Sequence, residues 1–274
     1  MIEGIKEIGD IIISGAPGEF LESIAKDVPP KKQKRKQHIV IIEFNTQKGT
    51  VNFDFEAIKK RTTREYLWIG NAKSNNPQDR FTTPNLEYLF SRTIPNFRVL
   101  TPGTELGELF EKLKDKFYYT IGIQKRQEER CRYMWNVQKL KVSSQNMKKL
   151  WEKASNNPKK MINLVSNEIY ECLKREKELT KNEIALFTLK IDGQLMVNLP
   201  EYRKYLENSI VEEPFSDKTT GVCHLCQKGN KITHDMAMFD FKYYITDKIG
   251  FSSELQKDGF FKNFSLCKEC YKKL

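Results

Sequence analysis

The chain lacks the sequence signatures of the common enzyme classes. Its 274 residues contain no Walker phosphate loop, no dinucleotide-binding glycine fingerprint, no HExxH metalloprotease motif and no GxSxG nucleophile elbow. Histidine, the most frequent general acid and base, occurs only three times. We therefore expect a protein without catalytic activity. A metal-dependent nuclease that uses Asp235, Asp240 or Asp247 stays open as an alternative, although these aspartates form no evident cluster in the sequence.

Long apolar runs are also missing. No run approaches the roughly eighteen residues that a membrane-spanning helix needs. The N-terminus carries acids and a helical hydrophobic period instead of a basic start and an apolar run, so no signal peptide is predicted. Cysteine is scarce, and Cys131 and Cys172, which lie outside the metal pattern described below, are expected to be buried rather than disulfide-bonded. These features predict a cytoplasmic protein with no membrane partner.

Positive charge is abundant and concentrated in two segments. The formal net charge is +11 and the isoelectric point is near 9.2. The run 31–36 contains five cations and no acid, and the segment 139–160 contains seven lysines and one acid, Glu152. Together they account for the whole excess. Concentrated positive charge attracts phosphate backbones, so we expect a nucleic-acid partner. A solvated loop and a solvated helix face are the alternatives.

A polar loop and a cation–aromatic stretch add further candidates for nucleic-acid contact. In the loop from Gly70 to Arg80, asparagine amides could read base edges, although an ordinary surface loop explains this composition better. Between residues 118 and 135, cations alternate with aromatics, which suits base stacking but also a protein core. The candidate residues are Lys31, Lys32, Lys34, Arg35, Lys36, Lys73, Asn75, Asn76, Arg80, Arg126, Arg130, Arg132, Lys148 and Lys149.

The hydrophobic pattern predicts an α+β fold, in which helices pack on an antiparallel sheet. We expect an opening helix to about Ser14, a second short helix near Phe20, and further helices at 85–91, 104–117, after Pro158 and after Pro200. Predicted strands are His38–Phe44, Val51–Phe55, Glu65–Ile69 and a hairpin at 184–198 around Asp192-Gly193. We divide the chain into an N-terminal helix and sheet domain at 1–120, a basic helical region with a hairpin at 121–217, and a zinc-binding region at 218–274.

Two cysteine pairs dominate the last fifty or so residues. Cys223-His-Leu-Cys226 and Cys267-Lys-Glu-Cys270 are CxxC pairs separated by 40 residues. Each pair can face one ion from a tight turn, and two pairs form the closed four-sulfur site of structural zinc. An iron–sulfur cluster, or cysteines that only lie nearby, are the alternatives. Because four thiolates fill the coordination shell, we interpret His224 and His234 as non-ligands and the zinc as structural.

Several segments of the chain, above all in the tail, carry a family resemblance. They are the Ile-rich N-terminal helix, Trp68-Ile-Gly-Asn-Ala72, Leu86-Glu-Tyr-Leu89, Ile191-Asp-Gly193, Cys223-His-Leu-Cys226, Phe241-Lys-Tyr-Tyr-Ile-Thr-Asp-Lys-Ile-Gly-Phe251 and Phe264-Ser-Leu-Cys267-Lys-Glu-Cys270-Tyr271. These segments resemble the large subunit of type I-B CRISPR effector complexes, the Cas-eight-b (Csh-one, TM-eighteen-oh-two) family. Family members usually continue beyond the second cysteine pair, so we expect a fragment.

The resemblance implies a non-catalytic, DNA-binding subunit of a CRISPR RNA-guided surveillance complex (Cascade) in antiviral defence. Such a subunit recognises the protospacer-adjacent motif in double-stranded DNA and recruits a separate helicase–nuclease, while guide pairing reads the sequence. The implied partners are double-stranded DNA, CRISPR RNA, the other Cascade subunits and the helicase–nuclease. Two alternatives stay open: a zinc-stabilised nuclease of a defence system, and a structural or assembly module that contacts guide RNA and partner subunits.

Overall fold

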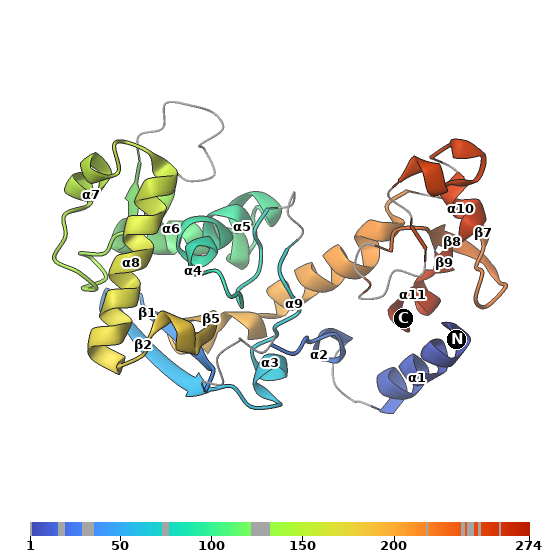
Figure 1. Cartoon of the computed structure of the whole chain (residues 1–274), viewed down its shortest axis with the longest axis horizontal. Helices are drawn as coiled ribbons and strands as arrows, with labels where there is room; N and C mark the ends of the chain where they lie inside the picture. The colour runs from blue at the N-terminus through green and yellow to red at the C-terminus, as the bar shows by residue number, and fades with distance from the viewer. Residues whose placement is uncertain are drawn as a thin grey trace. The chain divides into compact units, whose positions relative to one another are not determined.

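The computed structural model describes residues 2–15, 20–28, 36–72, 77–121, 132–217, 219–236, 239, 244–245, 248–257 and 259–274 (Figure 1). The chain forms two compact units, a larger one from Ile24 to Arg203 and a smaller one that combines Met1–Ser23 with Lys204–Leu274. Helices and strands occur in both units, which confirms the α+β class. Among the described residues, no helix combines the length and the apolar content that a membrane crossing requires.

The larger unit is built on a four-stranded sheet with the order β2-β1-β5-β6. Its strands are β1 (His38–Asn45), β2 (Thr50–Ala57), β5 (Ile184–Ile191) and β6 (Gln194–Leu195). The β1–β2 and β5–β6 pairs are antiparallel as predicted, whereas β1 and β5 run parallel, so the sheet is mixed. A parallel pair needs a long crossover, and local sequence patterns do not reveal which distant strands it joins.

The β5–β6 hairpin has the two-residue turn that its sequence predicts. Asp192 and Gly193 both have positive φ, at 48° and 85°, and this backbone conformation matches the twist of the flanking strands. The Asp192 carboxylate accepts hydrogen bonds from the Thr46 backbone N–H at 2.7 Å and from the Thr46 hydroxyl at 2.5 Å. Asp192 therefore ties this turn to the turn between β1 and β2.

The predicted third strand, Glu65–Ile69, is wrong. The helix α3 (Thr62–Glu65) occupies its start, and Leu67 then adopts a left-handed φ of 48° that no strand accommodates. The apolar side chains are nevertheless buried, and Trp68 packs in a cluster with Ile39 and Leu186. The segment looks like a strand in sequence because burial alone, without strand pairing, selects the same residue types.

The helices between the sheet strands bury a core of aromatic side chains. The predicted helix at 85–91 is present as α4 (Leu86–Tyr88) and the π-helical turn η1 (Leu89–Thr93), and it continues as α5 (Ile94–Leu100). The helix α6 (Glu105–Phe117) begins at the expected cap, where the Thr104 side chain accepts a hydrogen bond from the Gly107 N–H. Phe44 of the sheet meets Phe117 and Trp135 edge-on, with ring centroids 4.9 and 5.0 Å apart.

The basic middle of the chain is only partly helical. Two short strands, β3 (Tyr118–Thr120) and β4 (Tyr133–Trp135), pair with each other, which corrects the prediction of a helical segment there. The helices α7 (Met147–Lys153) and α8 (Pro158–Lys177) follow, and the side chains of Asn146 and Asn157 cap them. Tyr118 and Trp135 are buried, so these aromatics belong to the core rather than to a stacking surface.

The smaller unit joins the two ends of the chain. It contains α1 (Ile2–Gly15), α2 (Phe20–Ser23), the end of α9 (Pro200–Glu207), η5 (Asn208–Glu212), η6 (Glu213–Phe215), η7 (Ile249–Phe251), η8 (Ser253–Leu255), α10 (Gly259–Asn263), α11 (Lys268–Lys272) and a three-stranded sheet of β7 (Thr220–Val222), β8 (Gly229–Thr233) and β9 (Leu266–Cys267). Asp10 of α1 forms an ion pair with Lys273 at 2.5 Å. A Cβ atom on Gly9 would lie 2.0 Å from the Lys273 carbonyl oxygen, so α1 approaches the C-terminal segment closely enough to require glycine.

Candidate metal centre

The first cysteine pair lies in the turn between β7 and β8. The Cys223 N–H donates to the Lys228 carbonyl at 3.0 Å, and the Gln227 N–H donates to the Cys223 carbonyl at 2.9 Å. Gln227 has a left-handed φ of 58°, which bends the chain back sharply after Cys226. These backbone bonds fix both cysteines on one side of a tight turn.

The second cysteine pair lies where β9 passes into α11. Cys267 is the last residue of β9 and the cap of α11, and Cys270 follows one helical turn later on the same face. β9 pairs antiparallel with β8, with Ile232 opposite Cys267. Because β8 begins directly after the turn that holds Cys223 and Cys226, this strand pairing places the second cysteine pair beside the first.

The four cysteines converge as the sequence predicts. The sulfur atoms of Cys223, Cys226, Cys267 and Cys270 all lie within 4.8 Å of one another, and the Cys226 and Cys267 sulfurs are 3.7 Å apart. A tetrahedron with Zn–S bonds of about 2.3 Å has sulfur–sulfur edges of about 3.8 Å. A disulfide would need sulfurs about 2.05 Å apart. A cluster of several irons separates some of its thiolates further, because they bind different irons. The site therefore fits one tetrahedral metal ion.

The site is also the centre of the smaller unit's core. Cys223, Cys267 and Cys270 are buried, and Cys226 is half-buried. The cluster also contains the buried side chains of Phe215, Met236, Phe264, Leu266 and Tyr271, and Ile2, Leu225, Phe239 and Leu274 pack against it. A unit of this size buries little apolar surface, so bonds to a metal ion would supply much of its stability.

The thiols differ in how readily they give up a proton. Burial raises the pKa of Cys223, but hydrogen bonds from the backbone at Cys226, Cys267 and Leu225 outweigh it and lower this pKa to about 7. Burial raises the pKa of Cys267 and of Cys270, and for Cys270 the hydrogen bond with Cys267 and the charge of Cys223 raise it further. Several thiolates this close repel one another unless a cation lies between them. Metal binding therefore displaces protons, and its affinity falls as pH falls.

The group of potential metal ligands includes neither histidine of the region. The Ser265 N–H donates to the Nδ1 atom of His224 at 2.9 Å, so this nitrogen acts as an acceptor within the protein. His234 packs against the rings of Phe260 and Phe261. Among the nuclease candidates, Asp240 and Asp247 lie outside the described residues, and Asp235 is half-buried and belongs to no described ligand group.

Comparison with protein families covers both units. Residues 1–208 match the family model described as CRISPR-associated protein TM1802, N-terminal domain, and residues 220–274 match that of its central domain. The chain belongs to the TM1802 family of CRISPR-associated proteins. Both cysteine pairs fall within the match to the central domain. No curated protein and no solved structure shows a significant match to the chain.

The predicted nucleic-acid contacts of this TM1802-family protein fall into three groups. Lys31, Lys32, Lys34, Arg35, Lys73, Asn75, Asn76, Arg126 and Arg130 lie outside the described residues. Lys36, Lys148 and Lys149 are exposed, and Arg132 is half-buried. Arg80 is only 8% exposed, and its Nη1 atom lies 2.7 Å from the carboxylate of Asp79. A guanidinium in this position is poorly placed to contact a phosphate backbone.

Two of these candidates, Lys148 and Lys149, belong to a larger group of exposed lysines. Met147, Leu150 and Ala154 turn the apolar side of α7 inward, and exposed lysines occupy its other side and the first turn of α8. We define the α7–α8 lysine surface as Lys148, Lys149, Lys153, Lys159 and Lys160. In the described part of the chain, none of these five lysines takes part in an ion pair. The sequence predicts only Lys148 and Lys149 as contacts, and Lys153, Lys159 and Lys160 enter only the charge count of 139–160.

Proposed function

We propose that this chain is a non-catalytic, DNA-binding large subunit of a CRISPR RNA-guided surveillance complex. Membership of the TM1802 family makes it a CRISPR-associated defence protein. The observation that carries the DNA-binding part of the proposal is the α7–α8 lysine surface, whose charges are exposed and not neutralised by carboxylates. In this role the subunit recognises the protospacer-adjacent motif in double-stranded DNA and recruits the helicase–nuclease.

The charge pattern supports phosphate contact rather than base reading. A lysine ammonium is a compact point charge on a flexible stem, which suits a phosphate backbone and carries little sequence information. In an RNA-guided complex, the guide reads the sequence by base pairing, and protein holds the duplex through its backbone. A lysine surface whose charges form no ion pairs is adapted to that second task.

The metal centre supports a structural role within this function. Four cysteine sulfurs close the coordination shell of a zinc ion and leave no position for a catalytic water. We therefore assign a structural zinc ion to Cys223, Cys226, Cys267 and Cys270. The lysine surface belongs to the larger unit and the cysteines to the smaller one. Metal binding and DNA binding can accordingly be tested separately.

The salt dependence of DNA binding tests the proposal. Replacing Lys148, Lys149 and Lys153 by Gln is expected to weaken binding to a duplex and to flatten the plot of log affinity against log salt. Each lost phosphate contact reduces the slope by about 0.9, because one counterion fewer is released. Fluorescence anisotropy with a labelled duplex at several salt concentrations measures both quantities.

A matched control removes charge of the same kind elsewhere on the larger unit. On α6, Lys112 is exposed and Lys114 is half-buried, and they lie 3.7 Å from Glu105 and Glu111, respectively. Their replacement by Gln should leave the slope nearly unchanged. If the α7 variant keeps the wild-type slope, the lysine surface does not contact DNA and this proposal fails.

A further inference from the structure

One of the four clustered cysteines is accessible to solvent. Cys223, Cys267 and Cys270 are buried, whereas Cys226 is half-buried. A cysteine that binds a metal ion is deprotonated, and the thiolate is the form that reacts with oxidants. Oxidation of protein cysteines follows thiolate character together with solvent access. Cys226 has both properties, so an oxidant in solution reaches its sulfur before it reaches the other three.

A second thiolate lies beside Cys226 and can complete its oxidation. The sulfur atoms of Cys226 and Cys267 are 3.7 Å apart, and a disulfide needs about 2.05 Å, so movement of the two side chains closes the gap. Redox-sensitive cysteines commonly have such a resolving cysteine next to them. Because these two cysteines belong to different CxxC pairs, a bond between them removes one metal ligand from each pair.

Hydrogen bonds that involve no metal hold Cys226 and Cys267 side by side. The His224 N–H donates to the Ser265 carbonyl, and the Ser265 N–H donates to the Nδ1 atom of His224, both at 2.9 Å. Each of these two residues lies two positions before the cysteine of its own segment. The bonds therefore join the two chain segments that carry the reacting sulfurs.

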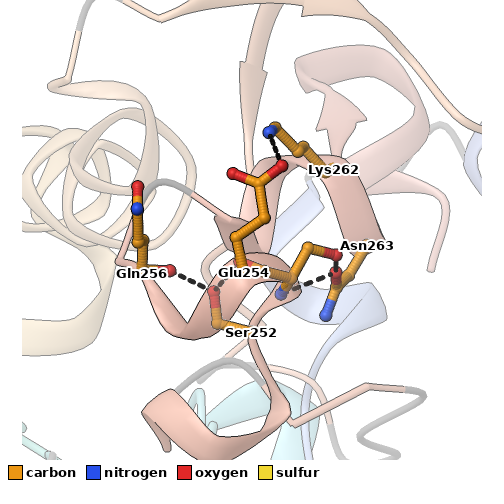
Figure 2. Close-up of polar contacts among 6 residues, drawn as sticks. Ser252, Glu254, Gln256, Lys262 and Asn263 are labelled. Atoms are coloured by element: carbon orange, nitrogen blue, oxygen red, sulfur yellow. Dashed lines mark hydrogen bonds and ion pairs between the residues drawn. The ribbon is translucent and has the colours of Figure 1, made fainter.

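The chain that leads to Cys267 is anchored as well (Figure 2). The Asn263 side chain accepts hydrogen bonds from the N–H and the hydroxyl of Ser253, and the Lys262 ammonium lies 2.7 Å from the Glu254 carboxylate. These contacts fix the end of α10, four residues before Cys267, to the stretch that precedes it. The second sulfur is thus held within reach by contacts that oxidation of the first leaves intact, which favours reaction between the two.

The oxidation consists of two balanced steps. The Cys226 thiolate attacks one oxygen of hydrogen peroxide, so that a sulfur–oxygen bond forms, the oxygen–oxygen bond breaks, hydroxide leaves and the cysteine becomes a sulfenic acid. The Cys267 thiolate then attacks the Cys226 sulfur, so that the disulfide forms, the sulfur–oxygen bond breaks and a second hydroxide leaves. The two sulfurs give up two electrons, and peroxide accepts them. Only Cys223 and Cys270 then remain as ligands, too few for a tetrahedral site.

We propose that Cys226 is an oxidant-sensitive site, at which hydrogen peroxide joins it to Cys267, releases the metal ion and loosens the smaller unit. This role depends on the structural zinc ion that we assigned to the four cysteines. The larger unit contains none of these cysteines, so its fold and its lysine surface persist. Reduction of the disulfide restores the ligands, which makes the change reversible.

Peroxide treatment of the zinc-loaded chain tests the proposal. Cys131 lies outside the described residues, so the chain carries Cys131→Ser. With a small molar excess of hydrogen peroxide, a zinc-binding dye should detect release of the zinc ion, and peptide mapping by mass spectrometry should find the Cys226–Cys267 disulfide. A dithiol reductant with added zinc should restore the metal site. Cys172 is the internal control, because burial raises its pKa to about 11 and keeps it a protonated thiol that should stay reduced.

Two variants with the same ligand set separate thiolate access from metal binding. Cys226→His and Cys223→His each leave three cysteines and one histidine, a set that also binds zinc. Only Cys226→His removes the accessible thiolate, so peroxide should release its zinc at least about tenfold more slowly than that of Cys223→His. Release into a chelator without peroxide corrects both rates for any difference in zinc affinity.

Three results would overturn the proposal. One is that the oxidised chain keeps its zinc ion. Another is that the disulfide joins a different pair of cysteines. The third is that peroxide releases zinc equally fast from the two histidine variants. A chain that holds no metal before oxidation would refute the zinc assignment and this proposal together. The salt dependence of DNA binding, measured on the reduced chain, distinguishes all of these outcomes from a failure of DNA binding.

Discussion

At the scale of single residues, the four cysteines are held by three different kinds of backbone. A tight turn with a left-handed residue positions Cys223 and Cys226, a paired strand positions Cys267, and a helical turn positions Cys270. None of these elements is long, and the sulfurs converge only when all three are formed. Each cysteine can therefore bind the metal ion and, through that bond, hold its own chain segment in place.

Replacement of one cysteine should accordingly affect both metal content and folding. We expect Cys267→Ser to lose the metal ion and to destabilise the smaller unit by several kcal/mol, on the order of the binding energy of structural zinc. Metal analysis of the purified protein, together with thermal unfolding, measures both effects. Cys172→Ser, at a buried cysteine outside the group, should keep one metal ion per chain. If Cys267→Ser keeps its metal and its melting temperature, the four-cysteine site is wrong.

At the scale of elements, local signals predicted well and distant pairings did not. The turn at Asp192-Gly193, the Thr104 cap and the start of α8 at Pro158 depend on residues a few positions apart, and all were predicted from the sequence. The parallel pairing of β1 with β5 depends on strands far apart in the chain, and no short pattern encodes it. The strand predicted at 65–69 is wrong because burial of Trp68 in the tertiary structure selects the same apolar residue types as a strand does. The cysteine quartet succeeded because metal-ligand spacing specifies chemistry and not only local conformation.

The contact of α1 with the C-terminal segment allows a test within one helix. Gly4 has open space where a Cβ would lie, whereas a Cβ at Gly9 would collide with the Lys273 carbonyl. Gly4→Ala should stabilise α1 by up to about 1 kcal/mol, because alanine favours the helix. Gly9→Ala should raise the helix propensity of α1 equally but disrupt its contact with Lys273. The α1 amides should therefore exchange hydrogen faster in Gly9→Ala than in Gly4→Ala. Equal exchange in the two variants would show that α1 does not pack against this segment.

At the scale of the whole molecule, the two units depend on different stabilising interactions. The larger unit has a sheet with an aromatic core, and the smaller unit has a core centred on four cysteines. All three tryptophans, Trp68, Trp135 and Trp151, belong to the larger unit, so intrinsic tryptophan fluorescence reports on that unit alone.

Removal of the metal ion should therefore destabilise the smaller unit and leave the larger unit folded. A strong chelator is expected to speed hydrogen exchange in β7, β8, β9 and α11 while the tryptophan emission maximum stays where it was. Mass spectrometry of exchanged peptides and fluorescence on the same sample provide the two measurements. A red shift of the emission that follows metal loss would mean that the larger unit unfolds with the smaller one.

The long crossover between β1 and β5 has a consequence for synthesis of the chain. His38 pairs with Ile184 and Phe44 with Ile191, so β1 lacks its central partner until most of the chain has been made. At about 5–20 residues per second, the ribosome needs on the order of ten seconds to supply that partner. During this time β1 has only β2 beside it, and an isolated hairpin is marginally stable. The nascent chain therefore exposes Ile39, Val40 and Ile42, which become fully buried in the finished protein, and this strand is a natural target for chaperones during translation.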